Sequence, residues 1–300
     1  MNKQSLIKEI NRLREEKNAV ILAHVYQDGN IQDIADFTGD SLALSKKAVD
    51  TSAELIVFCG VTFMAETAHI LNPEKKVLLP SIEAGCGLAD MATVDQLKQQ
   101  KKKYPNAAVV SYVNSSSEIK ALSDVCCTSA NAVEIVQAME QDTILFLPDK
   151  NLGSYVAEHT DKNIILWDGY CYVHEQITPD QIKELKEQHP DAEVIVHPEC
   201  PKSVRDISDF IGGTGHMARY VKESEINEFI VGTEDNFCYR LQKDNPNKIF
   251  YPVKTQCIGM SKTTLVDVKD ALENEQYEIT IQENTRKKAY KALDNMMKLS

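Results

Sequence analysis

Three stretches of the 300-residue chain share one pattern: SLIKEINRLREEKNAVILAHVY (residues 5–26), TVDQLKQQKKKYPNAAVVSYVN (93–114) and TPDQIKELKEQHPDAEVIVHPE (178–199). Each begins with a hydroxyl residue suited to capping a helix, and the second and third add the Gln of a capping box. Each helical segment then breaks, and a short apolar, β-rich run follows. The sequence therefore predicts a helix followed by a strand, three times over.

The similarity continues beyond these stretches, because each is followed by two more helix–strand pairs and then by a cysteine. Such alternation predicts an α/β fold of three domains, each a three-layer α/β/α unit with a small parallel sheet, related by a pseudo-threefold axis. The expected domains are residues 1–86 with a C-terminal helix at about 262–300, residues 87–171, and residues 172–261. The C-terminal segment is expected to pack on the first domain through one apolar stripe of Ala289, Ala292, Leu293, Met296 and Met297.

Polar residues end the first strand of each repeat. Ligands of parallel sheets bind at the carboxyl ends of strands, and alternate residues point the same way. Each repeat thus offers one pair of polar side chains for a common ligand: His24 with Tyr26, Tyr112 with Asn114, and His197 with Glu199.

A hydroxyl residue recurs at a fixed distance beyond each strand, as Ser41, Ser129 and Thr214. One interpretation is a plain helix N-cap in each case. The other is that the hydroxyls, at helix N-termini, bind carboxylate or phosphate groups of a small substrate.

Cys86, Cys171 and Cys257 are almost evenly spaced, one at the end of each repeat. If the three repeats are related by a threefold axis, residues at equivalent positions close to that axis lie close to one another. Three thiolates without a fourth protein ligand suit a [4Fe–4S] cluster with one open iron, which can act as a Lewis acid. The alternative is zinc bound by the three cysteines and His174. The other cysteines do not recur and are interpreted as buried thiols: Cys59, Cys126, Cys127, Cys200 and Cys238.

The composition limits the possible partners. With 33 Lys and Arg against 45 Asp and Glu, the formal charge is −12, which disfavours nucleic acid. The N-terminus has no apolar signal segment, and no apolar run is long enough for a membrane span. Eight cysteines without a disulfide pattern suit a reducing compartment. We therefore expect a cytoplasmic protein.

Several motifs together resemble the quinolinate synthase family along nearly the whole chain: HVYQ, IADFTGDS, YVNSSSEIKALSDVCCTSANA, LPDKNLG, HPECP and GGTGHM. The resemblance implies three α/β domains with a [4Fe–4S] cluster at their junction, bound by Cys86, Cys171 and Cys257. It also implies condensation of iminosuccinate with dihydroxyacetone phosphate to quinolinate, for NAD biosynthesis, with possible transient transfer of iminosuccinate from the enzyme that makes it.

By the same resemblance, substrate-contacting positions fall on ten residues: His24, Tyr26, Ser41, Tyr112, Asn114, Ser129, His174, His197, Glu199 and Thr214. Glu199 is the candidate general acid or base, and His197, His174 and Tyr26 are candidates for moving protons. The alternative is a zinc-dependent lyase acting on a small anionic substrate. A non-catalytic iron–sulfur sensor is disfavoured, because it would need a partner-binding surface or a DNA-binding module, and this acidic chain offers neither.

Overall fold

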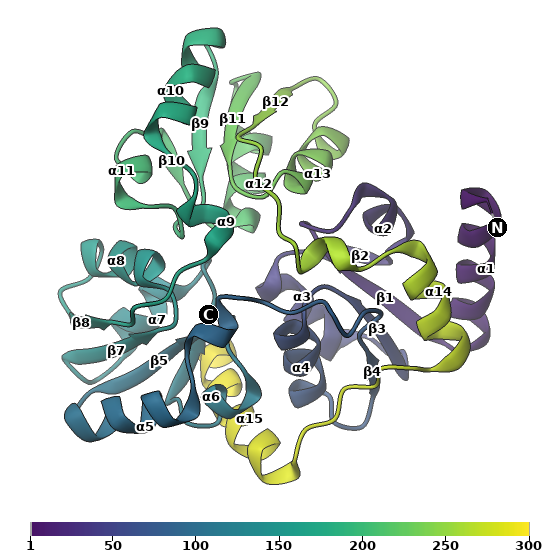
Figure 1. The fold of residues 1–300 in the computed structure, drawn as a ribbon, viewed down its shortest axis with the longest axis horizontal. Coiled ribbons are helices and arrows are strands. Elements are labelled where there is room, and N and C mark those ends of the chain that lie inside the picture. Colours follow the sequence, from purple (N-terminus) through teal and green to yellow (C-terminus); the bar gives the residue numbers. More distant parts are fainter. Residues whose placement is uncertain (1, 300) are drawn as a thin grey trace. The chain divides into compact units, whose positions relative to one another are not determined.

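Within residues 2–299, the part that the computed structural model describes, the chain forms three parallel four-stranded sheets (Figure 1). Their strand orders are β2-β1-β3-β4, β6-β5-β7-β8 and β10-β9-β11-β12, so the same topology occurs three times. Every pairing within these sheets is parallel. The predicted α/β class with three small parallel sheets is confirmed.

The chain divides into two compact units. Unit 1 comprises the described residues up to Cys86 together with Cys257–Glu283. Its strands are β1 Ala19–His24, β2 Phe37–Gly39, β3 Leu55–Cys59 and β4 Lys76–Leu78. Its helices are α1 Lys3–Glu16, α2 Gly29–Ile34, α3 Ser41–Asp50, α4 Thr62–Leu71, the short 3₁₀ helix Met260–Lys262 and α14 Leu265–Asn274. One face of the sheet, with Ile21 and Val57, packs on apolar residues of α1 and α14.

Unit 2 comprises Gly87–Gln256 and the described residues from Asn284 onward. It holds two sheets, formed by β5 Ala108–Tyr112, β6 Val125–Cys127, β7 Thr143–Leu147, β8 Asn163–Leu166, β9 Glu193–Val196, β10 Phe210–Ile211, β11 Glu228–Gly232 and β12 Ile249–Pro252. Its helices are the 3₁₀ helix Ala89–Met91, α5 Val94–Lys103, α6 Ser117–Lys120, α7 Ala132–Ala138, α8 Lys150–Glu158, α9 Tyr172–Glu175, α10 Pro179–Gln188, α11 Lys202–Arg205, α12 Thr214–Glu223, α13 Asn236–Asp244 and α15 Glu283–Leu299. Each sheet has an apolar core of its own.

One backbone contact recurs in all three sheets. The first strand of each sheet donates an N–H to an aspartate that precedes the neighbouring strand. Ile21 N donates to Asp36 Oδ2 at 2.8 Å, Val109 N to Asp124 Oδ2 at 2.7 Å, and Val194 N to Asp209 Oδ2 at 2.8 Å. The sequence repeat is therefore a repeat of atomic contacts as well as of topology.

The predicted helix caps are found in two of the three repeats. Thr93 and Thr178 form complete capping boxes with Gln96 and Gln181. The expectation for Ser5 is wrong, because α1 begins at Lys3 and the side chain of Asn2 accepts the N–H of Ser5 at 2.9 Å. Asn is as good an N-cap as Ser, and its position adds most of a turn to the helix.

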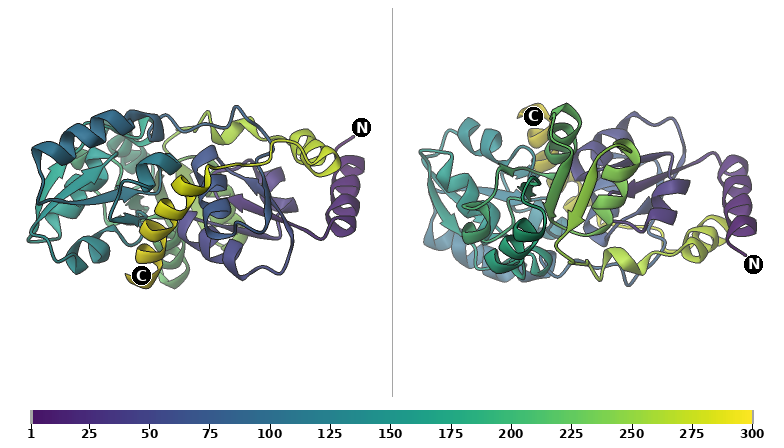
Figure 2. Two further views of the ribbon diagram at one scale, coloured as in Figure 1. Left: turned by 90° about the horizontal axis from the view of Figure 1, so that it is seen from below. Right: turned by 90° about the horizontal axis from the view of Figure 1, so that it is seen from above.

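The C-terminal helices belong to different units. In unit 1, α14 packs beside α1, as both views in Figure 2 show. By contrast, α15 groups with unit 2, where Asn295 Nδ2 donates to Asp124 O at 2.9 Å. The expectation that the whole segment 262–300 joins the first domain therefore does not hold for α15. Four residues of its predicted stripe, Ala289, Ala292, Leu293 and Met296, are fully buried.

No helix in residues 2–299 is long and apolar enough to cross a membrane.

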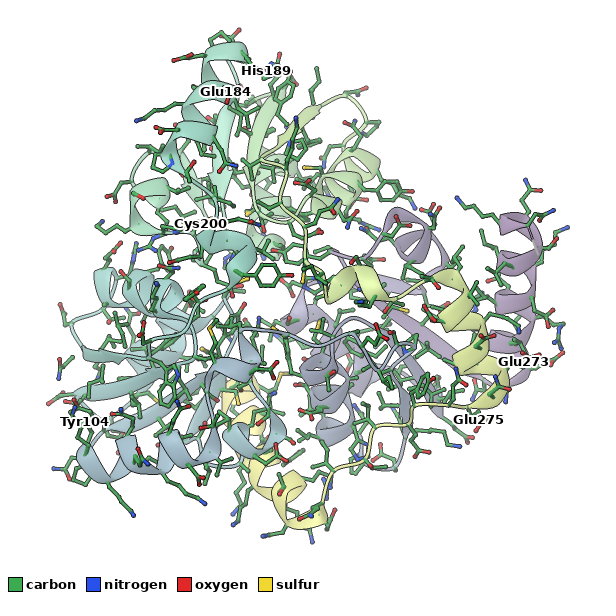
Figure 3. The ribbon with its side chains drawn as sticks, in the orientation of Figure 1. Tyr104, Glu184, His189, Cys200, Glu273 and Glu275 are labelled. Carbon is green, nitrogen blue, oxygen red and sulfur yellow. The ribbon has the colours of Figure 1, made fainter. Side chains whose placement is uncertain are left out.

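Glu275 is the C-cap of α14 and is labelled beside Glu273 in Figure 3. Its carboxylate contacts Lys17 Nζ at 2.7 Å and Lys76 Nζ at 2.6 Å, which ties α14 to the end of α1 and the start of β4. These lysines lower the pKa of Glu275 from 4.5 to about 2. The stabilisation is therefore complete above pH 4.5 and is lost as the pH falls through 2.

We expect Glu275→Gln to lower the free energy of unfolding at pH 7 by about 0.5–1 kcal/mol, since both ion pairs are partly exposed to solvent. Urea unfolding at pH 7 and pH 3.5 measures this, and the difference from the unsubstituted chain should be smaller at pH 3.5. A difference that stays constant or grows at the lower pH would contradict this role for the ion pairs.

Candidate functional site

Three metal-binding residue types meet in unit 2. Cys171 precedes α9, His174 lies on that one-turn helix, and Glu199 follows β9. Their ligand atoms, the thiol sulfur, a ring nitrogen and a carboxylate oxygen, all lie within 4.8 Å of one another. Cys171 is partly exposed, whereas His174 and Glu199 are buried. Sequence analysis predicted a role for each of these residues, and the fold brings the three together.

The Glu199 carboxylate lies beside the Nδ1 atoms of two imidazole rings. Its Oε2 is 2.7 Å from His174 Nδ1 and 3.5 Å from His197 Nδ1. Burial alone would raise the pKa of Glu199, but the charges of His174 and His197 and the hydrogen bonds from His174 and Tyr112 outweigh it. The pKa of Glu199 is lowered to about 2. These neighbouring groups therefore favour the carboxylate form of Glu199.

The two imidazoles are fixed by hydroxyl groups on their other nitrogens. His174 Nε2 is 2.8 Å from Thr233 Oγ1, and His197 Nε2 is 3.1 Å from Ser129 Oγ. The rings stack, with centroids 4.6 Å apart and planes at 18°. Because each ring has a partner on both nitrogens, a proton can be held at, or moved between, defined atoms.

Asp149 positions the segment that carries Cys171. This residue caps α8, where its Oδ1 accepts the N–H of Leu152 at 2.7 Å, and its Oδ2 accepts the N–H of Cys171 at 2.9 Å. The side chain is fully buried. Burial and the charge of Glu199 raise the pKa of Asp149 well above its ordinary value, although the backbone hydrogen bonds oppose this.

The end of β5 supplies two further predicted residues. Tyr112 is buried and hydrogen-bonds to Glu199. Asn114 is partly exposed, yet its Oδ1 is buried and has no hydrogen-bond partner within the described part of the chain. An unsatisfied buried acceptor costs about 1–3 kcal/mol, so this oxygen is suited to a donor on a bound ligand.

None of the three recurring hydroxyl residues is an N-cap. Ser41 and Thr214 are the first residues of α3 and α12, whose caps are Asp40 and Gly213, and Ser129 precedes α7, whose cap is Asn131. The plain N-cap interpretation is therefore wrong, and capping does not account for these hydroxyls.

Ser129 and the start of α12 approach each other very closely in unit 2. A Cβ added to Gly213 would lie 2.8 Å from Ser129 Oγ and 3.3 Å from the backbone nitrogen of Ala130. Thr214 follows directly and is buried. The chain segments leading into α7 and α12 therefore meet beside His197, which suits an anion-binding position.

In unit 1, the predicted residues His24, Tyr26 and Ser41 lie near the carboxyl ends of β1 and β2. The rings of His24 and Tyr26 contact edge to face at 4.6 Å, and Tyr26 N donates to His24 Nδ1 at 3.1 Å. His24 pairs with Gly39, two residues before Ser41. The sheet of unit 1 thus places polar groups at the same strand ends as the sheets of unit 2.

The segments carrying Cys86 and Cys257 are in contact within unit 1. A Cβ added to Gly259 would lie 2.0 Å from the carbonyl oxygen of Gly85, so the two backbones touch. Lys262 Nζ and Glu83 Oε2 form an ion pair at 3.0 Å beside them. Two of the three predicted cluster ligands therefore come from segments fixed against each other.

The other cysteines differ from these three. Cys59, Cys126, Cys127 and Cys200 are fully buried, and burial raises the pKa of each thiol. Burial also raises the pKa of Cys238 to about 12. Cys238 is partly exposed, as are Cys86, Cys171 and Cys257. Because a thiolate is the metal ligand, a raised pKa disfavours these five thiols as ligands.

Asp149 and Thr233, which hold Cys171 and His174 in place, were not predicted from the sequence. Both follow the second central strand of their sheet, since Asp149 comes after β7 and Thr233 directly after β11. Ligands of parallel sheets bind at the carboxyl ends of strands, so the positions of Asp149 and Thr233 after β7 and β11 are a signal that could have identified them.

Known proteins similar to this chain share one description. A family profile described as "Quinolinate synthetase A protein" matches residues 8–298. The chain is 49% identical over 302 residues to the quinolinate synthase of Alkaliphilus metalliredigens, with both chains fully covered. It is 50% identical to quinolinate synthase 2 of Methanosarcina acetivorans, covering 100% of this chain and 97% of that one. It is 52% identical to the quinolinate synthase of Clostridium acetobutylicum, covering 98% of each.

Proposed function

From the premise that this chain belongs to the quinolinate synthase family, whose members are enzymes of NAD biosynthesis, we propose that it condenses iminosuccinate with dihydroxyacetone phosphate. The products are quinolinate, phosphate and two waters. The observation that carries this proposal is the Glu199 carboxylate next to the Nδ1 atoms of two stacked imidazoles, with Cys171 close by. A condensation with two dehydrations needs acid–base groups of this kind next to a metal-binding position.

The proposed cofactor is a [4Fe–4S] cluster bound by Cys86, Cys171 and Cys257. Two observations support these three residues as the ligands. The segments that carry Cys86 and Cys257 are in contact, and burial raises the pKa of the non-recurring thiols. When bound, a cluster with three protein ligands would supply a Lewis acid for substrate oxygen or nitrogen atoms.

Proton transfer is assigned to Glu199 and His174. Each water lost from the substrates requires a proton delivered to the departing hydroxyl and a proton removed from a neighbouring carbon or nitrogen. The contact of 2.7 Å between Glu199 Oε2 and His174 Nδ1 allows a proton to be held on either partner. His197 and Tyr112 stabilise the carboxylate form, which keeps Glu199 unprotonated before the transfer, and the adjacent His174 gives the proton a second position.

Substrate binding is assigned to groups around this pair. Ser129 and Thr214 would hold carboxylate or phosphate oxygens, because they lie at converging helix starts. The unpartnered Oδ1 of Asn114 would accept a hydrogen bond from the substrate nitrogen. We propose His24, Tyr26 and Ser41 as further substrate contacts, with Tyr26 also able to move protons.

Gly213→Ala tests the anion-binding position. The new Cβ would force Ser129 Oγ away from its position 3.1 Å from His197 Nε2. A misplaced binding group commonly costs an order of magnitude, so we expect kcat/KM to fall about tenfold, mostly through a higher KM. Steady-state kinetics checks this, with the exposed Ala138→Gly as a control at the end of α7. Unchanged kinetics for Gly213→Ala would remove Ser129 from substrate binding.

An anaerobic product assay tests the function itself. Iminosuccinate is generated in place, dihydroxyacetone phosphate is added, and quinolinate is measured by chromatography. We expect quinolinate and phosphate to form in equal amounts. No quinolinate from a protein containing its metal would contradict the proposal.

The ligand types of Cys171, His174 and Glu199 also suit zinc, so a zinc-dependent lyase acting on a small anionic substrate is the alternative function. In that case the anaerobically purified protein would contain zinc and form no quinolinate from these substrates.

The eight cysteines, none of them in a disulfide, suit the reducing cytoplasm that we propose as the location.

A further inference from the structure

Arg205 at the end of α11 is almost fully buried, with 2% of its surface exposed. Its guanidinium lies between two parts of unit 2 that belong to different sheets. Toward the third sheet, Nη1 donates to Cys200 O at 2.8 Å and is 3.5 Å from Pro198 O. These two carbonyls flank Glu199. The guanidinium therefore holds the backbone on both sides of the proposed acid–base residue.

Toward the second sheet, the same guanidinium contacts α8. Nη1 donates to Asn151 O at 3.2 Å, and Nη2 reaches Ser154 Oγ at 3.4 Å and Glu158 Oε1 at 2.9 Å. A buried positive charge is costly unless it is paired and hydrogen-bonded. Here these contacts supply the pairing, and they fix the Glu199 segment against α8.

The start of α8 also positions the rest of the site. Asp149, its N-cap, accepts the N–H of Cys171, and Asn151 Nδ2 donates to Glu175 Oε2 at 2.6 Å on the helix that carries His174. Cys171 and His174 are thus held by side chains of α8, and Glu199 is held by Arg205, which binds α8. The distance between Glu199 and His174 depends on both connections.

We propose that Arg205 is a positioning residue for Glu199, fixing its carboxylate against His174 through the carbonyls of Pro198 and Cys200. The proposal rests on the proposed function of Glu199 as the acid–base residue. The hydrogen bonds of Arg205 go to backbone carbonyls and to side chains of α8, so its effect on Glu199 passes through the backbone of residues 198–200.

Arg205→Lys is the first test. Lysine keeps the charge, but its single ammonium group cannot reach both the Cys200 carbonyl and Glu158 with the geometry of a guanidinium. We expect kcat to fall about tenfold while KM changes less than threefold, with iron content unchanged. Arg240→Lys is the matched control, because Arg240 pairs with Asp244 on the surface helix α13, and it should keep the original kcat. An unchanged kcat for Arg205→Lys, a loss confined to KM, or a parallel loss of iron would overturn the proposal.

A double-mutant cycle separates positioning from general stabilisation. In a Glu199→Gln background, Arg205→Lys should reduce kcat little further, because the group that it positions is already absent. A merely structural role would give the same tenfold loss in both backgrounds and would overturn the proposal. If Glu199→Gln alone turned over at the original rate, the proposed function of Glu199 would fail instead, so the two failures are distinguishable.

Glu158→Gln supplies a second variant in case Arg205→Lys does not fold. The Glu158 side chain is 32% exposed, and glutamine keeps an acceptor for Arg205 while removing the counter-charge. The expected result is a smaller loss of kcat with KM unchanged, again absent in the Glu199→Gln background. A loss of the same size in both backgrounds would overturn the proposal.

Discussion

Cys171→Ala is expected to yield a colourless protein without iron–sulfur absorbance and without measurable quinolinate formation. Cys171 is the only proposed cluster ligand in unit 2, and its backbone N–H is held by the buried Asp149. Loss of one of three thiolate ligands should prevent assembly of the cluster. The Lewis acid that the proposed cluster would supply is worth several kcal/mol of transition-state stabilisation, so turnover should fall on the order of 10³-fold or more. Anaerobic absorption spectra, iron analysis and the product assay measure these effects.

Cys238→Ala is the matched control. Cys238 is also partly exposed and also in unit 2, but burial raises the pKa of its thiol to about 12. This variant should keep its colour, its iron and its turnover. If Cys238→Ala abolished the cluster while Cys171→Ala retained it, the ligand assignment from the sequence repeat would be wrong.

Glu199→Gln is expected to keep the cluster but to lower kcat by about 10²–10⁴-fold, the usual contribution of a positioned acid–base group. Glutamine fills the same buried space and can still accept a hydrogen bond from His174, but it cannot take up a proton. The readouts are kcat from the product assay and iron content. KM should change much less than kcat, because the loss affects the proton-transfer steps.

A control for Glu199→Gln is Glu193→Gln at the other end of the same strand. Glu193 accepts a hydrogen bond from Tyr220 at 2.7 Å, far from the proposed chemistry at the carboxyl end of β9. Its replacement should leave kcat unchanged. A Glu199→Gln protein that turned over at the original rate would remove Glu199 from the mechanism, and an equal loss in both variants would point to a stability effect.

The fold was predictable to a large extent because its signal is repeated. One helix–strand pattern could be ambiguous, but three copies with the same spacing predict three small parallel sheets, and the structure adds that all three share one strand order. The polar strand ends of β5 and β9 were predicted for the same reason, and Tyr112, His197 and Glu199 do lie at one site. The contact of Glu199 with His174 was not predicted from spacing, since it joins a loop after β9 to the short helix α9.

What could not be predicted depends on contacts between segments far apart in the sequence. Asn2 and Ser5 lie within one helical turn of each other, and both residue types are favourable N-caps, so the sequence alone does not decide between them. The apolar stripe of α15 predicted burial correctly but carried no information about which unit it packs on. Arg205 gave no signal, because a lone arginine on a short helix is usually at the surface.

The most direct test of the central claim is the iron and acid-labile sulfide content of the chain purified without oxygen. The claim is that Cys86, Cys171 and Cys257 bind a cluster next to the acid–base pair of Glu199 and His174. It predicts a brown protein with about four irons and four sulfides per chain. A colourless protein that holds one zinc and no sulfide would contradict it.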